Sequence, residues 1–182
     1  GLFDVLAGEI DGITWRVTLN EKWQPLHADV MHSCGCYYMA FPSRYLKAKP
    51  PSRKSGKSLE EALWIPAKLP ETKSPNQRVA IRISGPKHYV RGISVIDNHD
   101  RAVELTIRPY HTLRSLLDDN GDHASMFSSD GMVPGSHRLE RWLLWPMGVR
   151  SAGAMRQWGH HAIAFVGQRH FDDPDLIEKY FM

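Results

Sequence analysis

Both cysteines of the chain lie in one short stretch, His32-Ser33-Cys34-Gly35-Cys36, with a histidine two residues before the first cysteine. Imidazole nitrogen and thiolate sulfur bind zinc or copper(I) in preference to calcium or magnesium. Three such donors so close together predict a metal half-site made of His32, Cys34 and Cys36.

The spacing of these donors requires a bent backbone. On a straight strand the three side chains share one face, and donors two residues apart stand about 6.5–7 Å from each other. Tetrahedral zinc needs donors about 3.3–3.8 Å apart. The chain must therefore curl, and Gly35 between the cysteines permits this.

A fourth ligand must come from elsewhere, and the chain has ten histidines. His160 and His161 are adjacent, so on a strand they face opposite sides. His160 shares its face with Ala162 and Ala164, whose small side chains leave room for a site, whereas His161 shares its face with larger apolar residues. His160 is therefore the predicted fourth ligand.

Two other states of the cysteines fit the same pattern. Cys34 and Cys36 can be buried, inert thiols, since free cysteine is among the most buried residue types. They can also form a disulfide, although the Cα separation across one residue is at the upper edge of what a disulfide bridge tolerates. Metal content and thiol titration distinguish the three states.

Three function classes stay open. The first is a metal-binding domain with a structural or accessory role. The second is an enzyme that uses Cys34 or Cys36, or the metal, with His160 as general acid or base. The third is a structural or interaction module of a larger protein or assembly, suggested by the first residue, which is Gly rather than Met, and by a long basic loop.

Common catalytic and ion-binding signatures are missing from the sequence. Asp118-x-Asn120-x-Asp122 begins like a calcium loop, but His123 and Ser129 stand where Gly and Glu are required. There is no Gly-x-Ser-x-Gly elbow, phosphate-cradling loop or dinucleotide fingerprint. Several aromatic and methionine side chains predict either core packing or the wall of a ligand pocket: Trp142, Trp145, Met147, Met155 and Trp158.

The elements that would position these residues are mainly strands. Apolar and polar residues alternate with a period of two, as in Ile13 to Leu19 and Val79 to Ile83, and polar turns separate these runs. The pattern predicts a β-dominated α+β fold, with antiparallel sheets in a sandwich- or barrel-like meander and a few short helices. Strands are expected within 12–32, 78–108 and 161–166, and helices near 112–117, 136–145 and 174–181.

The length of 182 residues fits a single domain, 1–182. Five prolines and most of the basic residues of the first third fall between 47 and 76, which predicts a long, exposed Pro/Lys-rich loop. The loop is expected to be an insertion in the domain, because neither flank is self-sufficient.

Charge and hydropathy limit the partners. Six of the 23 basic residues lie between 44 and 57, a stretch that contains no acidic residue. The other 17 basic residues and the 20 acidic residues of the chain give a net charge of −3. This charge distribution disfavours a nucleic-acid docking face. The expected partner is therefore another protein or the rest of a larger parent chain. No apolar run reaches the roughly 20 residues that span a bilayer. Ten His and seven Met suit copper handling, so an exported or periplasmic location is favoured, although the location stays open.

Overall fold

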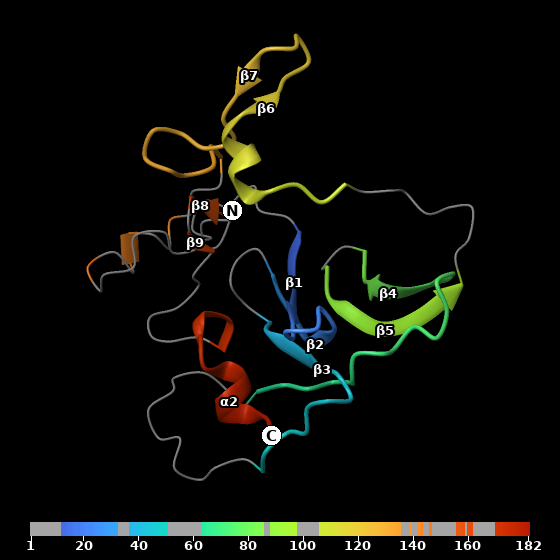
Figure 1. Cartoon of the computed structure of the whole chain (residues 1–182). Helices are drawn as coiled ribbons and strands as arrows, with labels where there is room; N and C mark the ends of the chain where they lie inside the picture. The colour runs from blue at the N-terminus through green and yellow to red at the C-terminus, as the bar shows by residue number, and fades with distance from the viewer. Residues whose placement is uncertain are drawn as a thin grey trace. The chain divides into compact units, whose positions relative to one another are not determined.

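The computed structural model describes residues 12–32, 37–50, 63–85, 88–97, 106–135, 139, 142–143, 146, 156–158, 160–161 and 170–182 (Figure 1). The described strands pair antiparallel and the helices are few and short, which confirms the β-dominated class. The sandwich- or barrel-like closure stays a prediction. Within the described residues, no helix is long and apolar enough to cross a membrane.

The chain divides into two compact units. Unit 1 comprises Gly1–Asp11, Ser33–Gly35 and Asp100–Val166, and unit 2 comprises Gly12–His32, Cys36–His99 and Gly167–Met182. Unit 2 is thus assembled from segments on both sides of unit 1 in the sequence. The prediction of a single domain is not tested by this division.

Unit 2 is built on a three-stranded sheet in the order β1 (Ile13–Leu19), β2 (Pro25–His32), β3 (Met39–Pro42). The predicted hairpin within 12–32 is confirmed, with Arg16 opposite Asp29 in the register. Its turn is held by Asn20, whose Oδ1 accepts the backbone N–H groups of Lys22 at 3.0 Å and Gln24 at 2.9 Å. Such an Asx-type turn is a local device, so the sequence determines the hairpin on its own.

The core of unit 2 lies on both faces of β2. On one face, Ala28 and Val30 pack with Met39 and Phe41, and Trp15 lies 5.7 Å from Phe41 between ring centroids. The opposite face carries buried polar groups and a second apolar cluster of Ala40, Leu46 and Phe181. A strand covered on both faces is buried without alternation, and the five consecutive residues from His27 to Met31 are all buried.

A second hairpin, β4 (Gln77–Ile83) and β5 (Val90–Asp97), pairs antiparallel within unit 2. Its apolar residues sit opposite one another, with Ile81 facing Ile93 and Ile83 facing Val90 in the register. Val90 and Ile93 pack against the core cluster around Phe41. The alternation in the sequence therefore predicted the β4 strand, but Val79 and Ile83 of its apolar face are 39% and 42% exposed.

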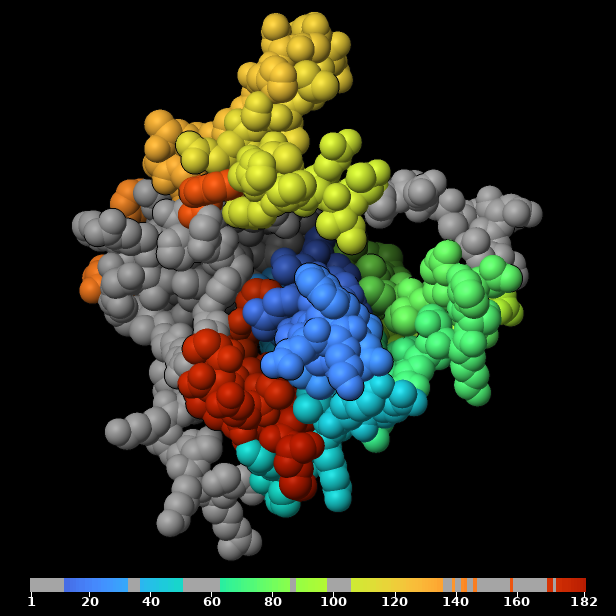
Figure 2. All heavy atoms as spheres, in the orientation of Figure 1, coloured from blue at the N-terminus to red at the C-terminus, as the bar shows by residue number. Residues whose placement is uncertain are grey.

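The C-terminal segment completes unit 2 with η3 (His170–Asp172) and α2 (Leu176–Tyr180). Phe181 pairs with Ala48 in an isolated β-bridge, and Lys47 and Met182 exchange backbone hydrogen bonds of 2.8 and 2.9 Å. Figure 2 shows this segment, in red, lying against the first hairpin, in blue.

The predicted 47–76 loop is described only at its two ends. Apart from Ala48, residues 47–50 and 63–76 are in neither helix nor strand, and most of them are exposed. Trp64 accepts the N–H of Ala40 at 2.9 Å, and Leu63 and Ile65 pack on the second core cluster. Residues 51–62 lie outside the described part, so the exposed loop as a whole stays a prediction.

Unit 1 has shorter elements: η1 (Tyr110–Arg114), β6 (Leu116–Leu117), β7 (His123–Ala124), β8 (Arg156–Gln157) and β9 (His160–His161). The helix expected near 112–117 is a short 3-10 helix that begins earlier and gives way to β6. The strand expected at 161–166 overlaps β9 only at its first residue, and 162–166 lie outside the described residues. Most of the helix expected at 136–145 lies outside them as well.

Candidate functional site

His32, the first residue of the predicted half-site, ends β2 and pairs with Ile13 of β1. Its ring is half-buried between two tyrosines, with centroids 4.9 Å from Tyr37 and 5.1 Å from Tyr89. The two tyrosine rings are themselves in edge contact at 4.7 Å. The histidine is therefore fixed in an aromatic setting next to residues 33–36.

The two ring nitrogens of His32 have different surroundings. Nε2 is buried and has no hydrogen-bond partner among the described residues. A hydrogen bond between the ring and the backbone of His88 favours the protonated form. Burial, and to a smaller degree the charge of His88, lowers the pKa of His32 against the opposing effect of that hydrogen bond. The neutral imidazole is favoured, with the Nε2 lone pair unused.

The other predicted ligands are not described at the side-chain level. Cys34 and Cys36 lie outside the described residues, and His160 is placed in β9 of unit 1, opposite Gln157, without a described side chain. In the part of the chain that the structure describes, no three His, Cys, Asp or Glu side chains are grouped to hold a metal ion. The four-residue set is therefore untested as a site.

A buried ion pair, which the sequence reasoning missed, lies on the opposite face of the same hairpin from the Phe41 cluster. Arg16 donates from Nε to Asp29 Oδ1 at 2.9 Å and from Nη2 to Asp29 Oδ2. Tyr38 donates its hydroxyl to the same carboxylate at 2.7 Å, and Asp29 is fully buried. The signal in the sequence was an acid within a strand of otherwise buried residues.

The side chains of the Arg16–Asp29–Tyr38 cluster are engaged with one another and are not set up for acid–base chemistry. Burial by itself lowers the pKa of Arg16, but the hydrogen bond and charge of Asp29 outweigh it and raise that pKa. Burial, with the Asp29 carboxylate, raises the pKa of Tyr38 far above its ordinary value, so the phenol stays protonated. Arg16 also donates to the Phe171 carbonyl at 3.0 Å and covers its ring at 4.0 Å. The cluster ties the C-terminal segment to the sheet.

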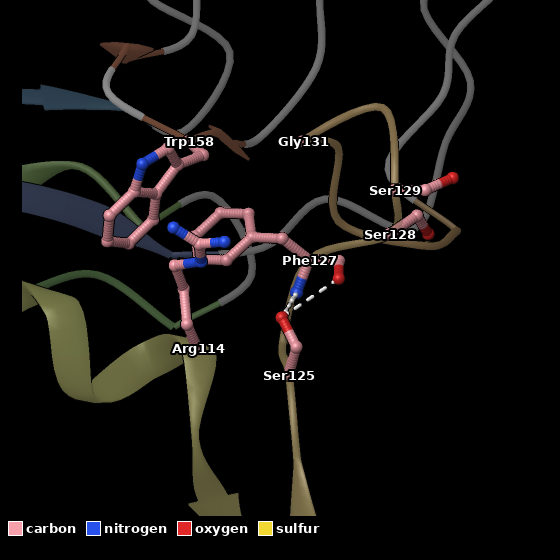
Figure 3. Close-up of a pocket in the computed structure, with 7 residues that line it drawn as sticks. All are labelled: Arg114, Ser125, Phe127, Ser128, Ser129, Gly131 and Trp158. Atoms are coloured by element: carbon pink, nitrogen blue, oxygen red, sulfur yellow. Dashed lines mark hydrogen bonds between the residues drawn. The ribbon is translucent and has the colours of Figure 1, made fainter.

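A pocket of about 360 Å³ lies within unit 1 (Figure 3). Arg114 at the end of η1, Phe127 and Trp158 form one part of its lining. Ser125, Ser128, Ser129 and Gly131 form the rest. Trp158 belongs to the aromatic group for which the sequence left core packing and a pocket wall as alternatives, whereas Arg114 and the serines carried no sequence signal.

Comparison with known protein families, curated proteins and solved structures finds no match for this chain. Three places in the described residues have unused binding capacity: the Nε2 atoms of His27 and His32 in unit 2 and the pocket beside Arg114 in unit 1.

Proposed function

We propose that the protein is a metal-binding domain in which His32, Cys34 and Cys36 hold a zinc or copper(I) ion and His160 supplies a fourth ligand. The observation that supports this most is the buried Nε2 atom of His32, which lacks a partner among the described residues and lies at the start of the cysteine-containing stretch.

The state of the His32 ring matches what a metal ligand requires. A metal-bound histidine is neutral and usually donates its other ring N–H to a carbonyl or carboxylate, which fixes the tautomer and the ring orientation. The backbone hydrogen bond with His88 suits that role, and burial favours the neutral ring. A buried nitrogen without a partner otherwise carries a desolvation penalty of about 1–3 kcal/mol.

The surroundings of His32 also suit a metal centre. Tyr37 and Tyr89 pack against the ring and shield it from solvent. A shell of this kind controls solvent access and the local dielectric at a metal site. Two thiolates with imidazole favour zinc or copper(I) over harder cations.

The proposed role is structural or accessory. Thiolate ligands in a closed four-coordinate set leave no position for a substrate, as in structural zinc sites. Binding energy at such a site is also folding energy, so the metal would stabilise the end of β2 and the segment that follows it.

Elemental analysis of the protein purified without chelator tests the proposal. The wild-type chain should contain zinc or copper near one equivalent. Cys34→Ser, Cys36→Ser and His32→Gln should each lose the metal and lower the unfolding temperature. His111→Gln, which changes an exposed histidine of η1, is the matched control and should keep the metal.

The alternative outcomes are separable. Metal-free protein whose two thiols titrate only after unfolding would mean inert, buried cysteines. If the protein is metal-free and its thiols titrate only after a reductant is added, Cys34 and Cys36 form a disulfide. A full equivalent of metal that remains bound in the Cys34→Ala/Cys36→Ala double variant would overturn the site. If His160→Gln kept its metal, only the assignment of His160 as the fourth ligand would be wrong.

A further inference from the structure

The pocket of unit 1 is built by three segments that are tied to one another through their backbones. The N–H of Met126 donates to the Leu113 carbonyl at 2.9 Å, and the N–H of Trp158 donates to the Gly131 carbonyl at 2.7 Å. A turn from Ser128 to Gly131 closes with a hydrogen bond of 2.9 Å, and Gly131 has a φ of 80°, which favours glycine. The walls of the pocket are therefore pre-formed, as in most small-molecule sites.

One wall of the pocket is aromatic. Trp158 stacks on Tyr110 at 4.8 Å with 15° between the ring planes, and Phe127 meets Trp158 edge-on at 5.4 Å. Ser125 anchors Phe127, because its hydroxyl accepts the Phe127 N–H at 3.0 Å and donates to the Phe127 carbonyl at 2.9 Å (Figure 3). Trp158 and Phe127 thus give this side of the pocket an apolar lining for a ligand with a ring.

A cation stands beside the aromatic wall. The Arg114 guanidinium lies 5.0 Å from the centroid of the Trp158 ring, a cation–π distance that holds it at the pocket. Among the described residues, no carboxylate lies within ion-pair distance of Arg114. The N–H donors of the Arg114 guanidinium lie in one plane, so two of them can bind the two oxygens of a carboxylate.

The described rim of the pocket carries little net charge. Ser128 and Ser129 add hydroxyls, and Arg114 is the one cation of the lining among the residues that the structure describes. Asp130 stands between Ser129 and Gly131 in the chain, with its carboxylate held by the Met132 N–H at 3.0 Å. One nearby cation opposed by one neighbouring acid fits a monoanion better than a dianion.

We propose that this pocket binds a small monocarboxylate that carries a flat ring, with the carboxylate on Arg114 and the ring against Trp158 and Phe127. A volume of about 360 Å³ is at the small end of ligand pockets, so the ligand is a single-ring acid rather than a nucleotide. The site shares no residue with the proposed metal centre.

Benzoate is the probe that tests this pocket, followed by NMR on the arginine Nε–H and tryptophan indole N–H signals of the full chain. Benzoate should shift the Arg114 and Trp158 signals saturably, with a dissociation constant in the millimolar range. Arg114→Gln should weaken binding at least about tenfold, and Arg114→Lys should weaken it less, because the charge remains while the planar fork is lost.

Arg108→Gln is the matched control, since Arg108 is also exposed in unit 1 but does not line the pocket, and it should leave the affinity unchanged. Benzamide, which keeps the ring and loses the charge, should bind at least about tenfold more weakly. Equal binding of benzamide, unchanged affinity in Arg114→Gln, or tighter binding of phenyl phosphate than of benzoate would each overturn the proposal.

Discussion

At the scale of single residues, the best-defined interaction in the molecule is the pair of Arg16 and Asp29. The two residues are directly opposite in the β1–β2 register, so the hairpin itself brings them together. They differ in exposure, because the Arg16 side chain is 40% exposed while that of Asp29 is fully buried. Removing either partner therefore has different consequences.

We predict that Arg16→Met lowers the free energy of unfolding by about 3–5 kcal/mol, because it leaves a carboxylate buried without its counter-ion. Asp29→Asn should cost less, about 1–3 kcal/mol, since the partly exposed guanidinium regains water and the amide oxygen still accepts a hydrogen bond. Urea denaturation at pH 7, followed by circular dichroism, measures both values.

Arg82→Met serves as the control for this pair of variants. Arg82 is an exposed residue of β4, and its replacement should change the unfolding free energy by less than about 0.5 kcal/mol. If Asp29→Asn destabilised the protein more than Arg16→Met, the asymmetry of burial would not be what determines the stability of this pair.

At the scale of elements, the β4–β5 hairpin is attached to unit 2 by one of its faces. Ile93 packs against the core cluster around Phe41, whereas Ile96, three residues further along β5, is 44% exposed. Residues an odd number apart on a regular strand point to opposite faces. Val90 and Ile93 are also three residues apart but reach the same cluster, because the register between β4 and β5 shifts between Arg82 and Ile83. The two isoleucines thus have the same strand and side chain but different burial.

Ile93→Ala should lower the free energy of unfolding by about 2 kcal/mol, since it removes part of a side chain packed in the core. Ile96→Ala should cost less than about 1 kcal/mol, a loss that reflects strand propensity and a little exposed area. Chemical denaturation of the two variants side by side gives the difference. Equal losses would mean that the hairpin does not dock through the Ile93 face.

At the scale of the whole molecule, the C-terminal segment encloses a histidine that the first hairpin places in the interior. His27 is 1% exposed, and its ring lies 5.6 Å from that of Phe181. Burial, and to a smaller degree the charge of Arg16, lowers the pKa of His27 against the opposing charge of Asp29. The folded chain therefore keeps this histidine neutral.

The pH dependence of global stability follows from this burial. The unfolded chain takes up a proton at His27 below about pH 6.5, while the folded chain resists it. Stability from this residue is thus present above about pH 6.5 and is lost as the pH falls. Urea denaturation at pH 7.5 and 5.5 should show a loss of which His27 accounts for at most about 1.4 kcal/mol.

His27→Phe keeps a ring against Phe181 and removes the titrating group, and His27→Gln removes both. Each variant should lose less stability between pH 7.5 and 5.5 than the wild-type chain does, whatever its stability at the higher pH. An identical loss in all three proteins would show that His27 takes no part in the pH dependence.

The sequence by itself determined the local architecture. The strands of 13–19 and 77–83 follow from a period-two pattern, and those of 25–32 and 90–97 follow from the turn residues that precede them, such as Asn20. Both signals act over a few neighbouring residues. Proline at 174 after Asp173 likewise predicted the last helix, which runs from Leu176 to Tyr180. The sequence also singled out His32 as a donor.

Only the tertiary structure decided what surrounds these residues. Arg16 lies 155 residues from the Phe171 carbonyl that it contacts, and the pocket of unit 1 joins η1, a turn near Gly131 and Trp158. Val17 and Leu19 show the limit of the pattern, because they are exposed although Ile13 and Trp15 of the same apolar face pack on the core. Contacts at such separation depend on how elements pack, which no local pattern encodes. The surroundings of the His32 ring likewise come from packing, since Tyr37, Tyr89 and the backbone of His88 lie around it.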